Sequence, residues 1–196
     1  MALNQNTILS IKKQVPQAAR TQIQKQFGAA FQKLKNKMMV EFLNHPVTME
    51  LKAGVNSSNI SGTLGGGSGN LFSFIGFDGG SDPTKPIEDM LSQTTFKFLR
   101  VTNKSVEFAI DLPDAKEIFS VTPMPWAPGR SWARGIERGI SGLGYYLKIK
   151  TDNSRSGLGI QSSRKVRKSS SKFKNMQYIS ALLKKYKKEF ENLQLP

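Results

Sequence analysis

The stretch TFKFLRVTNKSVEFAIDL, residues 95–112, is the part of the sequence that indicates the fold most directly. Two runs rich in β-branched and aromatic residues, 95–102 and 105–112, lie on either side of Asn103-Lys104. In both runs large apolar residues occupy alternate positions, which predicts strands with one face turned inward. The inward residues are Phe96, Phe98, Phe108 and Ile110. The stretch therefore predicts an antiparallel hairpin whose apolar face must be covered by other elements.

Three amphipathic segments are the helices predicted to cover this sheet. Apolar residues recur at spacings of three and four along 17–43, 130–143 and 172–193, which places them on one face of each helix. The first helix is expected to end at Asn44-His45-Pro46, because the residue before a proline is held out of the α region.

Shorter segments complete the predicted order of elements. Alternating or continuous apolar residues predict strands at 47–52, 71–77 and 145–150, with a brief one at 158–161. Helical turns are predicted at 7–14, 86–93 and 114–120, the second of them beginning near Pro86. The predicted fold class is α+β: a small antiparallel or mixed sheet packed by a long N-terminal helix, a central helix and a C-terminal helix. We expect a single domain over residues 1–196, with a glycine-rich arm at 53–80 and a basic loop at 151–171.

Composition excludes several classes of protein. The chain has 196 residues, enough for one domain to bury a core without disulfides or metals. It contains no cysteine, which excludes thiol catalysis and cysteine-ligated metal sites. No stretch has the roughly 20 apolar residues of a membrane helix, and residues 1–17 lack the apolar core of a signal peptide. We therefore expect a protein made in the cytosol that contacts no membrane.

Candidate catalytic groups all have simpler structural explanations. The only histidine, His45, adjoins Pro46 at a predicted helix end, where capping is a simpler role than general-base catalysis. Acidic pairs at 88–89 and at 111 and 114 suit helix starts and turns. The glycines at 62–69 lack the Gly-Lys-Ser/Thr of a phosphate loop and are expected to lead into a strand. We predict no enzyme activity, no cofactor and no metal site.

Positive charge is the strongest compositional signal. The net charge is +15, and residues 130–196 hold 16 Lys and Arg against 4 Asp and Glu. Such an excess predicts binding to polyanions that weakens as salt is added. The candidate contacts to DNA or an acidic partner are Arg130, Arg134 and Arg138 on one face of the predicted central helix, and Arg164, Lys165, Arg167 and Lys168 in the basic loop. Both groups also suit a solvated basic face, and any DNA contact would reach only the backbone because no base-reading motif accompanies them.

The glycine-rich arm and a proline-rich bend are candidate contacts between subunits. In the arm, Leu64, Gly66 and Gly67 lie where glycine permits close backbone approach. The arm is either a mobile loop or a loop that becomes ordered against a neighbouring subunit. Trp126, in the bend at 121–129, is either an interface anchor or a plug in the local core.

Four strings carry a resemblance to a known family: EFLNHPVTMELKAG (41–54), NISGTLGGGSGNLFSFIGF (59–77), PWAPGRSWARGIERGISGLGYYL (125–147) and SRSGLGIQ (154–161). Together they resemble virion structural proteins of the neck or tail-completion type in myovirus-like tailed bacteriophages. The resemblance spans residues 41–161 and includes no catalytic signature, so no functional residue is carried over from it.

The resemblance implies a structural subunit that joins the phage head to the tail around the DNA channel. Such proteins form hexameric or dodecameric rings, contact portal or adaptor proteins and tail or sheath proteins, and can face the DNA backbone. It also implies a virion location, at the neck, after synthesis in the host cytoplasm. The roles of adaptor, stopper, tail-completion protein and tail terminator all stay open. The alternative from the residues alone is a sequence-nonspecific nucleic-acid-binding protein acting through its basic C-terminal third.

Overall fold

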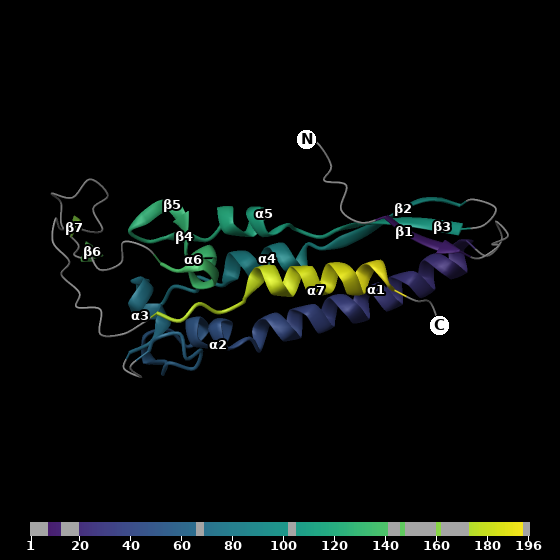
Figure 1. Ribbon diagram of the computed structural model, residues 1–196. Helices are drawn as coiled ribbons and strands as arrows, with labels where there is room; N and C mark the ends of the chain where they lie inside the picture. The colour runs from purple at the N-terminus through teal and green to yellow at the C-terminus, as the bar shows by residue number, and fades with distance from the viewer. Residues whose placement is uncertain are drawn as a thin grey trace. The chain divides into compact units, whose positions relative to one another are not determined.

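The computed structural model describes residues 8–12, 20–65, 69–101, 105–140, 146–147, 160–161 and 173–193 (Figure 1). The helices are α1 (Arg20–Leu43), α2 (Pro46–Ala53), the 3-10 turn η2 (Gly54–Asn56), α3 (Leu71–Ile75), α4 (Lys85–Ser92), α5 (Ala115–Ser120), α6 (Trp132–Arg138) and α7 (Ile179–Glu191). The strands are β1 (Ile8–Lys12), β2 (Thr95–Val101), β3 (Ser105–Asp111), β4 (Pro123–Met124), β5 (Ala127–Ser131), β6 (Tyr146–Leu147) and β7 (Ile160–Gln161). This mixture of helices and small antiparallel sheets confirms the predicted α+β class.

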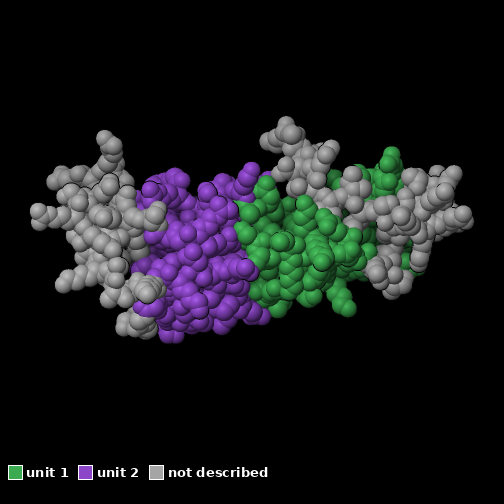
Figure 2. Space-filling model, in the orientation of Figure 1, with its two compact units in different colours: residues 1–42, 88–115, 180–196 green, residues 43–87, 116–179 purple. Residues whose placement is uncertain are grey.

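Contacts within the chain divide it into two compact units (Figure 2). Unit 1 consists of residues 1–42, 88–115 and 180–196, and unit 2 of residues 43–87 and 116–179. Each unit is built from separate stretches of the sequence. The sequence predicted a single domain, and no boundary along the chain separates one unit from the other.

The sheet of unit 1 contains the predicted hairpin. Its strand order is β1-β3-β2 and both pairings are antiparallel, with Phe98 opposite Phe108. The register shifts between Phe98 and Arg100, and Leu99 at this irregularity is 46% exposed. Strand β1 replaces the helical turn predicted at 7–14, where the apolar residues of ILSIK suit either structure. Its place beside β3 depends on a pairing with residues about a hundred positions later in the chain.

The apolar face of this sheet is covered by α1. Phe27 is fully buried and stacks on Phe108 with ring centroids 3.8 Å apart, while Phe96 meets Phe27 edge to face. One turn further along α1, Phe31 lies against Phe190 of α7 at 5.2 Å. Each buried phenylalanine contributes about 1.5–3 kcal/mol of transfer free energy. The apolar stripes that predicted the two long helices are therefore the surfaces that build the core of unit 1.

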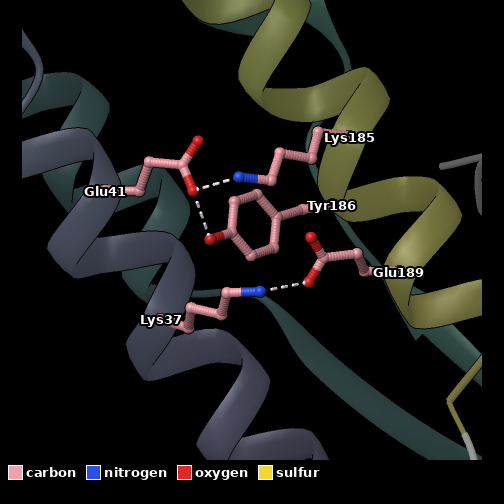
Figure 3. Close-up of polar contacts among 5 residues, drawn as sticks. All are labelled: Lys37, Glu41, Lys185, Tyr186 and Glu189. Carbon is pink, nitrogen blue, oxygen red and sulfur yellow. Dashed lines mark hydrogen bonds and ion pairs between the residues drawn. The ribbon is translucent and has the colours of Figure 1, made fainter.

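A polar network also joins α1 to α7 (Figure 3). Glu41 Oε2 accepts hydrogen bonds from Lys185 Nζ at 2.6 Å and from the Tyr186 hydroxyl at 2.7 Å, and Lys37 Nζ lies 2.9 Å from Glu189 Oε2. The hydrogen bond from Lys185 is the largest of the effects that hold the pKa of Glu41 below its ordinary value. Burial, followed by the contact with Glu41, raises the pKa of Tyr186, so this phenol stays protonated and donates.

The contribution of Glu41 to stability should depend on pH. Because its pKa is lowered in the folded state, the contribution is present above the ordinary pKa of 4.5 and is lost as the pH falls through the lowered value. We expect Glu41→Gln to cost less than about 1 kcal/mol at neutral pH, since the group is partly exposed. We also expect the variant to lose less stability than the wild type between neutral and acidic pH, measured by urea unfolding. Equal acid sensitivity of the two proteins would contradict this, and Glu191→Gln on the exposed side of α7 is the control.

Two short segments of unit 2 that were predicted as strands are helices. The strand predicted at 47–52 is helix α2, which begins at Pro46 and is capped by the Nδ1 atom of His45, 3.3 Å from the Val47 amide. His45 has an extended backbone, as expected before proline. The expected capping role is confirmed, but at the start of α2 and not at the end of α1. The buried residues of α2 are Val47, Thr48, Glu50 and Leu51, a helical spacing that includes two polar side chains. The prediction was wrong because it assumed that the polar residues face solvent.

The strand predicted at 71–77 is helix α3. The Asn70 side chain caps it by accepting from the Ser73 amide at 2.8 Å, and Gly76 ends it in the left-handed conformation. The glycines at 62–69 therefore precede a short helix and not a strand, which removes one of the two reasons given against a phosphate loop. The other reason, the lack of Gly-Lys-Ser/Thr, still holds.

The central and C-terminal helices are shorter than predicted. The central helix is α6, and it ends at Gly139, whose φ of +100° favours glycine. Helix α7 begins at Ile179, because the preceding residues use their backbone in other contacts. Phe173 forms a β-bridge with Leu64, the Lys174 amide donates to Thr63 O, and the Met176 amide donates to Ile136 O. The predicted strands at 145–150 and 158–161 correspond in their described parts to β6 and β7, which pair antiparallel.

Candidate anion-binding pocket in unit 2

Four basic residues surround an open pocket of about 450 Å³ in unit 2. Lys116 comes from α5, Arg130 from β5, and Arg134 and Arg138 from successive turns of α6. All four are exposed. The volume lies within the range of pockets that hold small ligands or a few residues of a peptide.

A hydrogen-bonded corner fixes the elements that carry these side chains. The Ser131 hydroxyl caps α6 by accepting from the Arg134 amide at 3.1 Å, and it also lies 2.7 Å from the Thr122 hydroxyl. The Trp132 amide donates to Thr122 O at 2.8 Å, and Thr122 is fully buried. These hydrogen bonds join the end of α5 to the start of α6 and hold the backbone on both sides of the corner.

Part of the pocket lining is apolar. Met124 is buried and Phe119 is half-buried, and both line the pocket. Gly135 is buried beside Met124, and a Cβ added to Gly135 would lie 2.8 Å from Met124 Cε and 3.0 Å from Ile140 Cγ1. Glycine at this position therefore allows Met124 to pack closely against α6.

Among the described residues, the side chains that line the pocket are basic, polar or apolar, and none is acidic. It consists of Lys116, Phe119, Ser120, Met124, Gly129, Arg130, Ser131, Arg134, Gly135, Arg138 and Gly139. The lining contains four cationic side chains and no carboxylate, so its net charge favours an anion. Arginine suits carboxylate and phosphate groups in particular, because its planar fork can donate two parallel hydrogen bonds.

The structure brings together the three arginines that the sequence singled out, but in a different way from the prediction. Arg134 and Arg138 lie on one helix as expected, whereas Arg130 precedes the helix and lies on β5. Lys116 was missed, because nothing in the sequence near α5 relates it to a group 14 or more residues later. Arg164, Lys165, Arg167 and Lys168 lie outside the described residues.

Two of the four predicted interface residues are described, and both lie in the interior of unit 2. Leu64 is 6% exposed, and its backbone amide and carbonyl both bond to the side chain of Asn59. Trp126 is 8% exposed, and its Nε1 donates to Ile75 O at 2.7 Å. This is the position expected of a plug in the local core. Gly66 and Gly67 lie outside the described residues.

Glu50 is a further residue of interest that the sequence did not single out. Its carboxylate is fully buried and accepts from the Ser61 amide at 2.7 Å and from the Leu71 amide. It therefore ties both ends of the glycine-rich segment between Ser61 and Leu71 to α2. The sequence places Glu50 in an amphipathic pattern, which gives no signal that it is buried.

The described residues contain neither a candidate metal site nor a helix able to span a membrane. No group of three or more His, Asp or Glu is placed there to hold a metal ion. Within the same residues, every helix is too short or too polar to cross a membrane. Comparison of the chain with protein-family models, with curated proteins and with solved structures found no significant match.

Proposed function

We propose that the protein is a non-catalytic structural subunit of the neck of a tailed phage, where it forms part of a ring that joins head to tail around the DNA channel. The observation that carries this proposal is the arrangement of the strings on which the resemblance rests. Within the described residues, strings far apart in the sequence pack together in unit 2.

Three hydrogen bonds join three of these strings. Glu50, from the first string, accepts from the backbone amides of Ser61 and Leu71 in the second. Trp126, from the third string, donates to Ile75 O in the second. Three of the strings that carry the resemblance therefore contact one another in one unit, which is the arrangement that a shared architecture requires.

The distribution of charge and apolar side chains also suits a subunit of an assembly. A net charge of +15 makes isolated copies repel one another, and an acidic protein or nucleic acid beside a ring of this chain would offset that repulsion. Within the glycine-rich arm, Val55 and Ile60 are 53% and 44% exposed, which leaves apolar surface available to a neighbour.

The test is the assembly state of the purified protein, alone and mixed with phage heads or tails, by native mass spectrometry and negative-stain imaging. We expect a hexameric or dodecameric ring that attaches to one of them. We expect Ile60→Asp at the arm to reduce assembly without lowering the melting temperature, whereas Leu99→Asp, with similar exposure in unit 1, should have little effect. A monodisperse monomer that binds neither heads nor tails would be evidence against a neck subunit.

The alternative proposal, a sequence-nonspecific nucleic-acid-binding protein, is favoured by the excess of positive charge in residues 130–196. It requires binding to any duplex, with an affinity that falls steeply as salt is added. Absence of duplex binding at low salt would eliminate it without affecting the ring proposal.

A further inference from the structure

We propose that the basic pocket of unit 2 is a docking site for an acidic peptide segment of a partner protein, in which carboxylates pair with Arg134 and Arg138 while an adjacent apolar side chain contacts Met124 and Phe119. This docking site deepens the proposed function, because it names the chemistry of a partner. It rests on the proposed function only for the identity of the assembly in which that partner is found. The chemistry of the pocket itself does not depend on whether the protein forms a ring.

Spacing along α6 matches an extended peptide. Arg134 and Arg138 are four residues apart on a helix, which corresponds to a rise of about 6 Å. Carboxylates two residues apart on an extended chain are separated by about 6–7 Å. Each arginine can therefore pair with a separate carboxylate of the pattern acid-x-acid, with Lys116 and Arg130 completing the basic rim.

The mixed lining favours a peptide over a nucleic-acid duplex. Met124 and Phe119 provide apolar surface inside the pocket, whereas the groups of a duplex that proteins contact most often are phosphate oxygens and sugars. A duplex is also too wide to enter a pocket of about 450 Å³, so it could contact only the rim. An acidic segment with one apolar residue satisfies both the rim and the interior.

A second copy of this chain is a poor occupant of the same pocket. Each copy carries a net charge of +15, so long-range electrostatics oppose the approach of another copy to a basic surface. An acidic partner of different sequence gains from the same field, both in the rate of encounter and in selectivity. Charge complementarity therefore assigns the pocket to a different, acidic protein.

The test uses the full chain and four probes in fluorescence anisotropy or competition. The probes are a labelled peptide with a phenylalanine among alternating Asp and Glu, its Asn/Gln analogue, a short DNA duplex and inorganic phosphate. We expect the acidic peptide to bind and the neutral analogue to bind at least about tenfold more weakly, as the loss of charge-assisted hydrogen bonds requires.

Variants locate the binding to the pocket. Arg134→Gln combined with Arg138→Gln should weaken the acidic peptide by about tenfold or more. Lys184→Gln combined with Lys188→Gln removes the same charge at the same helical spacing from α7 of unit 1, and should change affinity by less than about twofold. Phe119→Ala should weaken the peptide while leaving phosphate competition unchanged. All four basic positions are exposed, so the melting temperatures should stay at the wild-type value, and Lys116→Gln is a further single variant of the rim.

Three results would overturn the inference: no binding of the acidic peptide, equal loss of affinity in the pocket variant and the α7 control, or duplex binding that depends on Arg134 and Arg138 where peptide binding does not. The last result would assign the pocket to nucleic acid. Native mass spectrometry of the same samples separates this inference from the proposed function. A ring that ignores the peptide contradicts only the docking site, and a peptide-binding monomer contradicts only the ring.

Discussion

Replacing Glu50 by alanine is expected to lower the free energy of unfolding by about 3 kcal/mol, because two buried backbone amides lose their acceptor at once. The carboxylate accepts from Ser61 and Leu71 and is fully buried, so the truncation leaves both amides away from bulk solvent. The local loss of stability should be largest where the glycine-rich segment begins and ends, because the two amides mark its ends.

Glu50→Gln separates the charge from the shape of this side chain. The amide group keeps one acceptor but turns an N–H donor towards the second backbone amide, so we expect about half the loss seen with alanine. Urea unfolding gives the free energies, and hydrogen exchange should report reduced protection of the Ser61 and Leu71 amides. Glu191→Ala, an exposed change on α7, should stay within about 0.5 kcal/mol. If Glu50→Ala has the stability of that control, Glu50 does not hold the segment.

Trp126→Ala is expected to cost about 4 kcal/mol, the usual result of removing a large aromatic side chain from a packed interior. Trp126 is 8% exposed and its indole donates to Ile75 O, so the variant loses both packing and a hydrogen bond. Trp126→Phe keeps most of the packing and should cost about 1 kcal/mol for the hydrogen bond, with some further loss from the smaller ring.

Fluorescence offers a direct readout of these variants, because the chain contains only two tryptophans and Trp126→Phe leaves Trp132 as the reporter. An unchanged unfolding midpoint in Trp126→Ala would contradict a core role. If the variant stays folded but loses its assembly, the side chain also serves the interface, as the sequence-based alternative holds.

The elements that could be predicted from sequence are the ones with long or strongly patterned repeats. Helix α1 extends over more than six turns, so its apolar spacing is unambiguous, and the hairpin of β2 and β3 shows the alternation of strands. Helix α4 was signalled by Pro86 at its start. In these segments the burial pattern and the local preference of the backbone agree.

Predictions failed in short segments with buried polar residues. In α2, Thr48 and Glu50 are buried and have hydrogen-bond partners: Thr48 lies 2.8 Å from the Tyr178 hydroxyl and Glu50 reaches two amides. If the polar residues of 47–52 are assumed to face solvent, the pattern of these six residues favours a strand. The residues that are in fact buried have the spacing of a helix. The caps of these helices, His45 with Pro46 and Asn70, were visible in the sequence and were the better guide.

Only part of the candidate pocket could be predicted from the sequence, because only two of its four basic residues lie on the same helix. The spacing of Arg134 and Arg138 places both on one helical face from sequence alone. Arg130 reaches the same pocket from β5 and Lys116 from α5, and those placements depend on the corner at Thr122 and Ser131. Local periodicity carries no information about contacts between separate elements.

By itself, the sequence determined the α+β class, the main helices and hairpin, the local excess of positive charge and the absence of thiol chemistry, since these follow from composition and short-range pattern. The tertiary structure alone decided that Glu50 is buried, that Trp126 bonds to Ile75, and that basic residues from three elements surround one pocket. The physical reason is that a buried polar group must find its hydrogen-bond partner wherever the chain path brings one within reach. For Glu50 those partners are 11 and 21 residues away, and for Trp126 the partner is 51 residues away.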